Sequence, residues 1–326
     1  MPAPTTVITD WSSEFSWPHP VGRRIRPAPR TPPPPYAGDA DISSRRKTAR
    51  ADRAPAAPAD TYVARPFAGL PDETEWVALR EIVPAATARL PLRDSDAEVT
   101  LSTVLPAAWA GMVRLDGRRF LGLQVHARSG DVSRDLAAAL EQVLGGGPGT
   151  PVVATGQPGH GPRLQDLLDE RPLDVELHDG FDYWVDGTAD LDPEVTASME
   201  QANASIVPTA RVAGQRSAYW CRMKERAHLR WVMPYDEEPL LDALARLSVA
   251  GQVSLGEGTR YVGSFRAHGL LAPVWDLPLA TGAEALEEPA AAFRGRLDDA
   301  LAVTTTLTVE QRRARSGLLS RQLTLR

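Results

Sequence analysis

The sequence predicts an α+β protein of two similar lobes, each a small antiparallel sheet with a packed helix, preceded by a disordered tail. Three observations support this class: a proline-rich start, alternating strand and helix signals after it, and a second half that repeats the order of the first. The 326 residues suffice for two average domains. The expected organisation is a tail at 1–64, a first lobe at 65–168, an acidic hairpin connector at 169–202, a second lobe at 203–306 and a basic helix at 307–326.

Residues 1–64 have the composition of a segment that cannot build a core. They contain 12 of the 29 prolines, and nine basic residues against six acidic ones. Such a stretch is typical of intrinsic disorder. Its basic cluster, which includes Arg45, Arg46 and Lys47, can bind RNA, an acidic protein or the acidic surface of the chain itself, because guanidinium groups match phosphate and carboxylate oxygens. The alternative is a tail that only keeps the protein in solution.

The first lobe contains one hairpin and one helix with strong signals. Asp116 and Gly117 predict a two-residue turn between strand-forming residues, which places Val113 opposite Phe120. Residues 131–147 follow with helix signals: an aspartate N-cap, apolar residues every three to four positions, and three glycines at the end. We therefore expect this helix to pack on the hairpin.

The second lobe follows the same plan. It has a strand at 228–234, a helix at 236–251 and further strands at 252–265 and 269–277. The helix has an aspartate at its start and a glycine at its end, as helix caps require.

Short matches between the halves indicate an internal duplication. The tripeptide Ile-Val-Pro occurs at 82–84 and again at 206–208, and Trp109 aligns with Trp220 in the same order. The shared order of strands and helix is the main support for this interpretation. A duplication predicts two lobes related by a pseudo-twofold axis, with the cleft between them as the default binding pocket.

An acidic stretch connects the two lobes. Ten acidic residues lie between positions 169 and 194, with Arg171 as the one basic residue among them. Asp190, Asp192 and Glu194 alternate as the oxygen ligands of a hard divalent cation can, although the calcium-loop spacing is absent. The alternatives are a solvated acidic surface and a docking patch for a basic partner.

The histidines are the candidate catalytic residues. Within the stretch 175–185, a three-residue turn predicts a hairpin that puts His178 opposite Asp182, a pair that can orient an imidazole for base chemistry. His160 and His268 occupy aligned loop positions in the duplication, so they can form an acid/base pair or a metal site in the cleft. The alternative for these residues is a surface hydrogen bond or a simple turn before glycine.

Several classes of activity are excluded by what the sequence lacks. Cys221 is the single cysteine, so no disulfide within the chain and no cysteine-rich zinc site can form. It lies among strand-forming residues and is expected to be a small buried apolar side chain. The only lysines are Lys47 and Lys224, which excludes a Walker phosphate loop. We expect no cofactor.

Charge and hydropathy indicate a cytoplasmic protein without a membrane segment. The formal net charge is −6, and no run of 18 apolar residues occurs. The C-terminal segment is basic by contrast: Arg312, Arg313 and Arg315 lie on an expected helix that a capping box opens at Thr308. This helix can contact nucleic acid or an acidic protein, or it can pack on the chain's own acidic residues.

One resemblance rests on five segments, 66–88, 218–223, 228–238, 261–277 and 313–326, and covers about residues 62–326. Through these segments the sequence resembles a family of uncharacterised cytoplasmic proteins from actinobacteria. Proteins of this kind are sometimes labelled as relatives of topoisomerase II or of a preprotein translocase. The sequence supports neither label, because it has no gyrase-type ATP site, no Walker lysine and no Cys/His zinc tail. The resemblance therefore implies an uncharacterised domain and a cytoplasmic location, and it implies no activity.

These observations favour a non-catalytic binding or adaptor module that acts through the cleft between the lobes or through charged surfaces. Exposed tryptophans and segments of opposite charge are the support for this hypothesis. One alternative is a hydrolase or a metal-dependent enzyme that uses the histidines and nearby acids. The other is a nucleic-acid-binding accessory protein that uses its arginine-rich ends.

Overall fold

The computed structural model describes residues 62–126, 129–154, 156–186, 193–223 and 225–324. Most of the expected tail, including the basic cluster of Arg45, Arg46 and Lys47, lies outside the described residues. Tyr62 is the first described residue, and its side chain is exposed.

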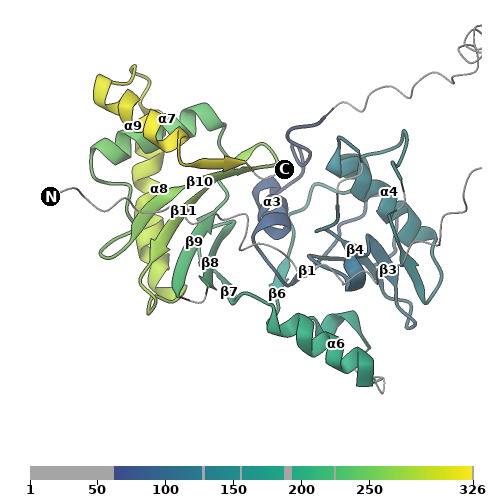
Figure 1. The fold of residues 1–326 in the computed structure, drawn as a ribbon. Helices are drawn as coiled ribbons and strands as arrows, with labels where there is room; N and C mark the ends of the chain where they lie inside the picture. Colours follow the sequence, from purple (N-terminus) through teal and green to yellow (C-terminus); the bar gives the residue numbers. More distant parts are fainter. Residues whose placement is uncertain (1–61, 127–128, 155, 187–192, 224, 325–326) are drawn as a thin grey trace, which may run out of the picture. The chain divides into compact units, whose positions relative to one another are not determined.

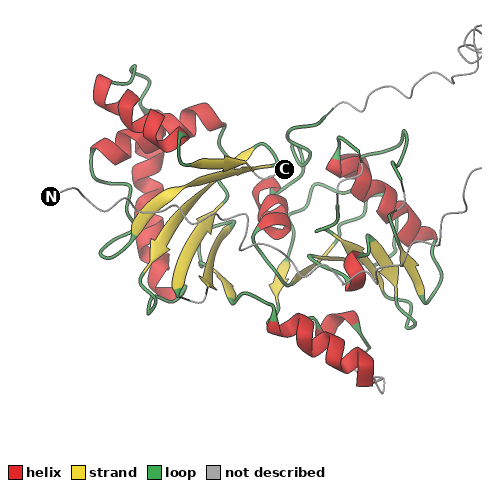
Figure 2. Ribbon diagram, viewed as in Figure 1, coloured by secondary structure: helices red, strands yellow, loops and turns green. Residues whose placement is uncertain are grey.

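The described residues form two six-stranded sheets (Figures 1 and 2). The first has the strand order β5-β3-β4-β2-β1-β6 and the second the order β12-β10-β11-β9-β8-β7. The strands of the first sheet are β1 (Ala86–Arg89), β2 (Val99–Ser102), β3 (Gly111–Val113), β4 (Arg119–Gly122), β5 (Thr150–Val152) and β6 (Val175–Leu177). Those of the second are β7 (Thr209–Arg211), β8 (Ala218–Met223), β9 (Arg226–Trp231), β10 (Arg260–Ala267), β11 (Leu270–Leu277) and β12 (Gln322–Thr324).

Helices accompany both sheets. They are α3 (Glu73–Glu81), α4 (Val132–Gly145), α5 (Leu164–Leu167), α6 (Pro193–Ala204), α7 (Glu237–Val249), α8 (Glu287–Ala302) and α9 (Val309–Leu319), with short 3-10 turns at Pro106–Ala108, Asp182–Trp184 and Glu284–Leu286. Apolar residues of α7 and α8 form one core with strands β8, β9 and β11. The α+β class with two lobes is therefore confirmed. The sheets are mixed and not purely antiparallel as predicted, because β2 is parallel to β4 and β10 is parallel to β12.

Helix α4 packs on the first sheet as the sequence predicts. Asp131 is its N-cap and accepts a hydrogen bond from the backbone N–H of Ser133. The approach to the sheet is close, because a Cβ atom on Gly111 of β3 would lie 2.3 Å from a methyl group of Val143. Only glycine fits at this point of contact.

The hairpin between β3 and β4 is confirmed, but its register differs from the prediction by one residue. Val113 lies opposite Arg119 instead of Phe120. The backbone N–H of Arg114 bonds to the carbonyl of Arg118, which leaves a three-residue loop in which Gly117 has a φ of 86°. A loop of three residues with glycine in the left-handed region shifts every pair relative to the two-residue turn.

The acidic hairpin predicted at 175–185 is wrong. Strand β6 pairs with β1, with Thr87 opposite Glu176, and residues 182–184 form a 3-10 turn. Residues 193–204 then form helix α6. The partner of β6 lies some 90 positions earlier in the chain, so this pairing is not visible in a local sequence pattern.

Both lobes consist of a sheet with packed helices, but the chain connects the strands and helices of the two lobes in different orders. Strands β2 and β4 are parallel, whereas β9 and β11, at the same place in the second sheet, are antiparallel. Helix α4 follows the fourth strand of its lobe, and α7 follows the third. The residue matches therefore do not hold throughout: Trp109 follows a 3-10 turn, while Trp220 lies within β8.

Candidate functional site

The space between the two sheets is filled by α3 (Figure 1). Phe67 and Trp76 belong to one apolar cluster that reaches from α4 to Ala267 and Leu270 of the second sheet. Each large side chain that is fully buried contributes about 1.5–3 kcal/mol. The prediction of a binding cleft between the lobes is therefore wrong, because core side chains occupy that seam.

Polar contacts of Glu75 reinforce the seam. Its carboxylate is 2% exposed and accepts hydrogen bonds from the Tyr219 hydroxyl at 2.5 Å, the Ser217 hydroxyl at 2.7 Å and the Arg211 guanidinium at 2.5 Å. Burial and the adjacent carboxylate raise the pKa of Tyr219. The buried charge is thus fully used to hold α3 against β7 and β8.

His160 and His268 are not brought together as an acid/base pair. His268 lies in the β10–β11 turn, and its Nε2 is 2.7 Å from Oε1 of Glu81 on α3. Burial opposes ionisation of Glu81, yet His268 and Arg80 hold its pKa below the ordinary value. His160 instead has an exposed side chain in the loop between β5 and α5. The alignment of these histidines in sequence does not produce a shared site.

The structure gives His178 partners other than Asp182. Nε2 of His178 lies 2.7 Å from the Thr87 hydroxyl, and its ring packs on Tyr183 at 4.7 Å between centroids. Asp182 is exposed at the start of the 3-10 turn. The hairpin that would have aligned them does not form.

The predicted metal ligands do not form a described site. Asp190 and Asp192 lie outside the described residues, and Glu194 is exposed in the first turn of α6. Within the described ranges, no three His, Cys, Asp or Glu side chains gather closely enough to hold a metal ion.

The basic C-terminal helix packs on the protein itself, the alternative that the sequence left open. Arg315 of α9 forms ion pairs with Asp242, at 2.7 Å, and with Glu238 on α7. Arg312 donates to the backbone carbonyl of Leu307, and Arg313 is exposed. The capping box at the start of α9 is confirmed. Arg315 is thus used internally.

A group of aromatic side chains covers the face of the first sheet opposite α4. We call Trp109, Phe181, Tyr183 and Trp184 the aromatic cap. Phe181 is buried and stacks on Trp184 with 4.2 Å between ring centroids, and the other three side chains are partly exposed. Trp109, Tyr183 and Trp184 pack on a small apolar cluster of Leu105, Met112 and Phe120.

Hydrogen bonds fix the aromatic cap in place. The indole N–H of Trp184 donates to the carbonyl of Val104 at 2.9 Å, and the Tyr183 hydroxyl lies 3.3 Å from that of Ser102. Nη1 of Arg114 donates to the carbonyls of Tyr183 and Val185, at 3.1 and 2.7 Å. The rings are therefore ordered before any ligand arrives.

Backbone strain occurs beside Trp109. Ala107 and Ala108 have φ angles of 51° and 53°, in the left-handed region that costs a residue with a Cβ atom about 1–2 kcal/mol. Strain of this kind persists where the surrounding structure demands it, and functional sites are one such place. Here Trp109 directly follows the strained turn as its C-cap residue.

Cys221, His228 and Asp276 lie side by side on strands β8, β9 and β11. They are cross-strand neighbours, and Nδ1 of His228 lies 3.1 Å from Oδ1 of Asp276. Burial raises the pKa of the Cys221 thiol, although the charge of Arg230 opposes this. The thiol is therefore held neutral, which fits a buried apolar role and not a nucleophile.

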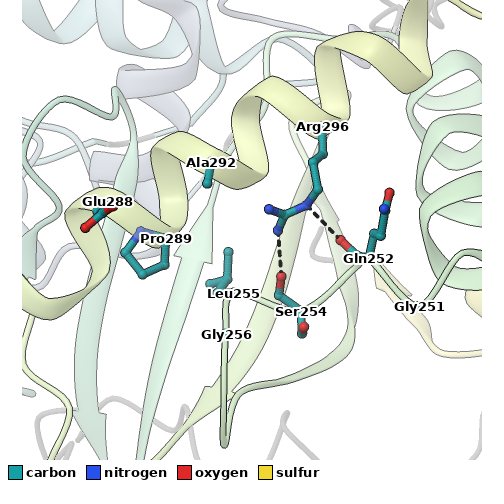
Figure 3. A pocket seen from close by; sticks show the side chains of 9 residues that line it. All are labelled: Gly251, Gln252, Ser254, Leu255, Gly256, Glu288, Pro289, Ala292 and Arg296. Carbon is teal, nitrogen blue, oxygen red and sulfur yellow. Dashed lines mark hydrogen bonds between the residues drawn. The ribbon is translucent and has the colours of Figure 1, made fainter.

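A pocket of about 540 Å³ lies between α8 and the loop after α7 (Figure 3). Arg296 reaches across it, and its guanidinium donates to the carbonyls of Gln252 and Ser254 (Figure 3). Glu288 and Leu255 also line it. Because the guanidinium serves to hold the loop, this pocket shows no set of converging polar groups for a ligand.

The sequence did not predict the aromatic cap, because Trp109 lies far in the chain from Phe181, Tyr183 and Trp184. The sequence predicts Tyr183 and Trp184 in a hairpin, and it relates Trp109 only to Trp220 through the duplication. The one signal in the sequence was the gathering of three aromatic residues at 181–184.

Among the described residues, no helix has both the length and the apolar character that crossing a membrane requires.

Comparison with known proteins identifies the family. No curated protein and no solved structure matches the chain. One family model matches residues 66–326, that of a family of unknown function, DUF5926. Since the match spans most of the chain, the protein belongs to the DUF5926 family.

Proposed function

We propose that the protein is a non-catalytic binding module that holds a segment of another protein against the aromatic cap. The observation that carries this proposal is the state of Trp109, Tyr183 and Trp184, which are ordered by hydrogen bonds and packing yet partly exposed. Tryptophan and tyrosine dominate the energetic centres of protein interfaces. Rings that are already ordered lose little entropy when a partner binds.

The candidate catalytic groups of the described residues support binding rather than catalysis. His178 contacts the Thr87 hydroxyl, and the carboxylate that pairs with His268, that of Glu81, lies in the filled seam, so neither histidine forms an acid/base pair at the cap. The thiol of Cys221 is neutral and buried. The hydrolase alternative uses a histidine with a nearby carboxylate, and His268 has such a partner, Glu81, within the filled seam. The nucleic-acid alternative loses Arg315 to an internal ion pair.

The test is a selection of binding peptides with a counter-selection against a cap variant. Peptides from a random 12-residue library are selected for binding to the full chain. The affinity of each selected peptide is then measured for the Trp184→Ala and Trp109→Ala variants. Because truncation of a central interface residue costs about 2 kcal/mol or more, each variant should bind about 30-fold more weakly. Two variants are used so that a folding defect in one does not decide the result, and thermal melting checks each.

The matched control is Leu115→Ala, which removes an apolar side chain that is 86% exposed at the β3–β4 turn. It should leave peptide affinity unchanged. Peptides that bind both cap variants as tightly as the wild type would reject the proposal, as would a selection that yields no binder at all.

A further inference from the structure

From the charges around the aromatic cap, we infer that the segment bound there carries arginine. This inference rests on the proposed function and names the chemistry of the partner. The cap is bordered by the exposed carboxylates of Glu176, Asp179 and Asp182. These come from β6 and from the turn that leads to Tyr183, so they adjoin the rings along the chain.

The corner next to the cap already binds one guanidinium of the chain itself. Arg114 donates to the carbonyls of Tyr183 and Val185 and forms an ion pair with Asp116. Its Cζ lies 5.6 Å from the centroid of the Phe120 ring. Carbonyl, carboxylate and aromatic face thus act together on a planar cation, which is the combination that suits arginine.

The remaining exposed groups offer the same combination to a second guanidinium. Tyr183 and Trp184 are partly exposed, and Asp179 and Asp182 supply exposed carboxylates within a few residues of them along the chain. A planar guanidinium can stack on a ring while its fork reaches a carboxylate, whereas an ammonium group can do only one of these well. A nucleic acid would bring phosphates toward these carboxylates and is disfavoured by repulsion.

Matched peptides test the inference on the full chain. Three fluorescent 10-residue peptides share one glycine-serine scaffold and carry two arginines, two lysines or two citrullines. Citrulline keeps the shape of arginine without its charge. We expect the lysine peptide to bind several-fold more weakly than the arginine peptide, and the citrulline peptide to bind most weakly of the three.

Charge variants locate the binding. The double change Asp179→Asn and Asp182→Asn should weaken the arginine peptide by about 3- to 10-fold, because each exposed ion pair contributes modestly. The matched control is Glu141→Gln with Asp299→Asn, which removes two exposed carboxylates from α4 and α8 and should change nothing. Raising the salt concentration should weaken wild-type binding more than binding by the double Asn variant.

The outcomes separate this inference from the proposed function. Equal affinity for the arginine and citrulline peptides would overturn the inference. An equal loss of arginine-peptide affinity in the Asp179→Asn and Asp182→Asn double variant and in its control variant would also overturn it. If selected peptides depend on Trp184 but contain no arginine, the proposed function stands and the arginine inference fails. If no peptide depends on Trp184, both fail.

Discussion

Replacement of Glu75 measures how strongly α3 joins the two lobes. Glu75→Ala removes the acceptor of two buried hydroxyl groups, those of Ser217 and Tyr219, and of the Arg211 guanidinium. A buried donor that loses its acceptor costs about 1–3 kcal/mol. Arg211 is 37% exposed, so water can replace part of its contact. Since Glu75 is almost fully buried, we expect a total loss of about 3–5 kcal/mol in the free energy of unfolding.

The assay is urea unfolding followed by tryptophan fluorescence, with linear extrapolation to water. Glu75→Gln keeps the shape and one acceptor oxygen, so it should lose about 2 kcal/mol. Glu141→Gln is the control: its exposed carboxylate should matter by less than about 0.5 kcal/mol. A loss of less than about 1 kcal/mol for Glu75→Ala would refute the reasoning, because it would mean that the carboxylate does not hold the seam.

Three further measurements address other parts of the structure. Cys221 should react with a thiol reagent at pH 8 at least about 100-fold more slowly than free cysteine, and urea should abolish the difference; fast labelling of the native protein would contradict its burial. Ala107→Gly should leave stability unchanged or raise it by about 1 kcal/mol, while Ala138→Gly within α4 should lower it by about 1 kcal/mol, and equal losses would argue against strain at Ala107. Because the folded state lowers the pKa of Glu81, its carboxylate stabilises the fold at pH values above the ordinary pKa of 4.5, and this stabilisation is lost as the pH falls through the lower pKa of the folded state. Glu81→Gln should therefore reduce the acid dependence of the free energy of unfolding. An unchanged dependence on pH would count against the contact with His268.

The sequence alone predicted the helices and the hairpin that depend on local signals. Helix α4 has its N-cap and apolar stripe within 14 residues, so no distant contact is needed to recognise it. The turn at Gly117 was also visible, but its length was not, because Asp-Gly pairs occur in both two-residue and three-residue loops. The strand at 175–177 pairs with β1, and nothing near it in the sequence indicates that partner.

The candidate site was harder to predict than the fold. Val104 and Arg114 fix the aromatic cap from some 70 to 80 positions away, and such contacts follow only from the folded sheet. The filled seam was equally hidden, because α3 carries a carboxylate whose partners lie more than 130 positions downstream. Glu75 looks like any acidic residue in the first turn of a helix until those partners are known.

Hydrogen exchange of the full chain, with and without the two-arginine peptide, tests most directly whether the aromatic cap is the binding surface. The account predicts slower exchange of backbone amides at 104–109 and 178–185 when the peptide is present, and no change at 251–256 beside the pocket of Figure 3. Protection at 251–256 with none at the cap would contradict the account.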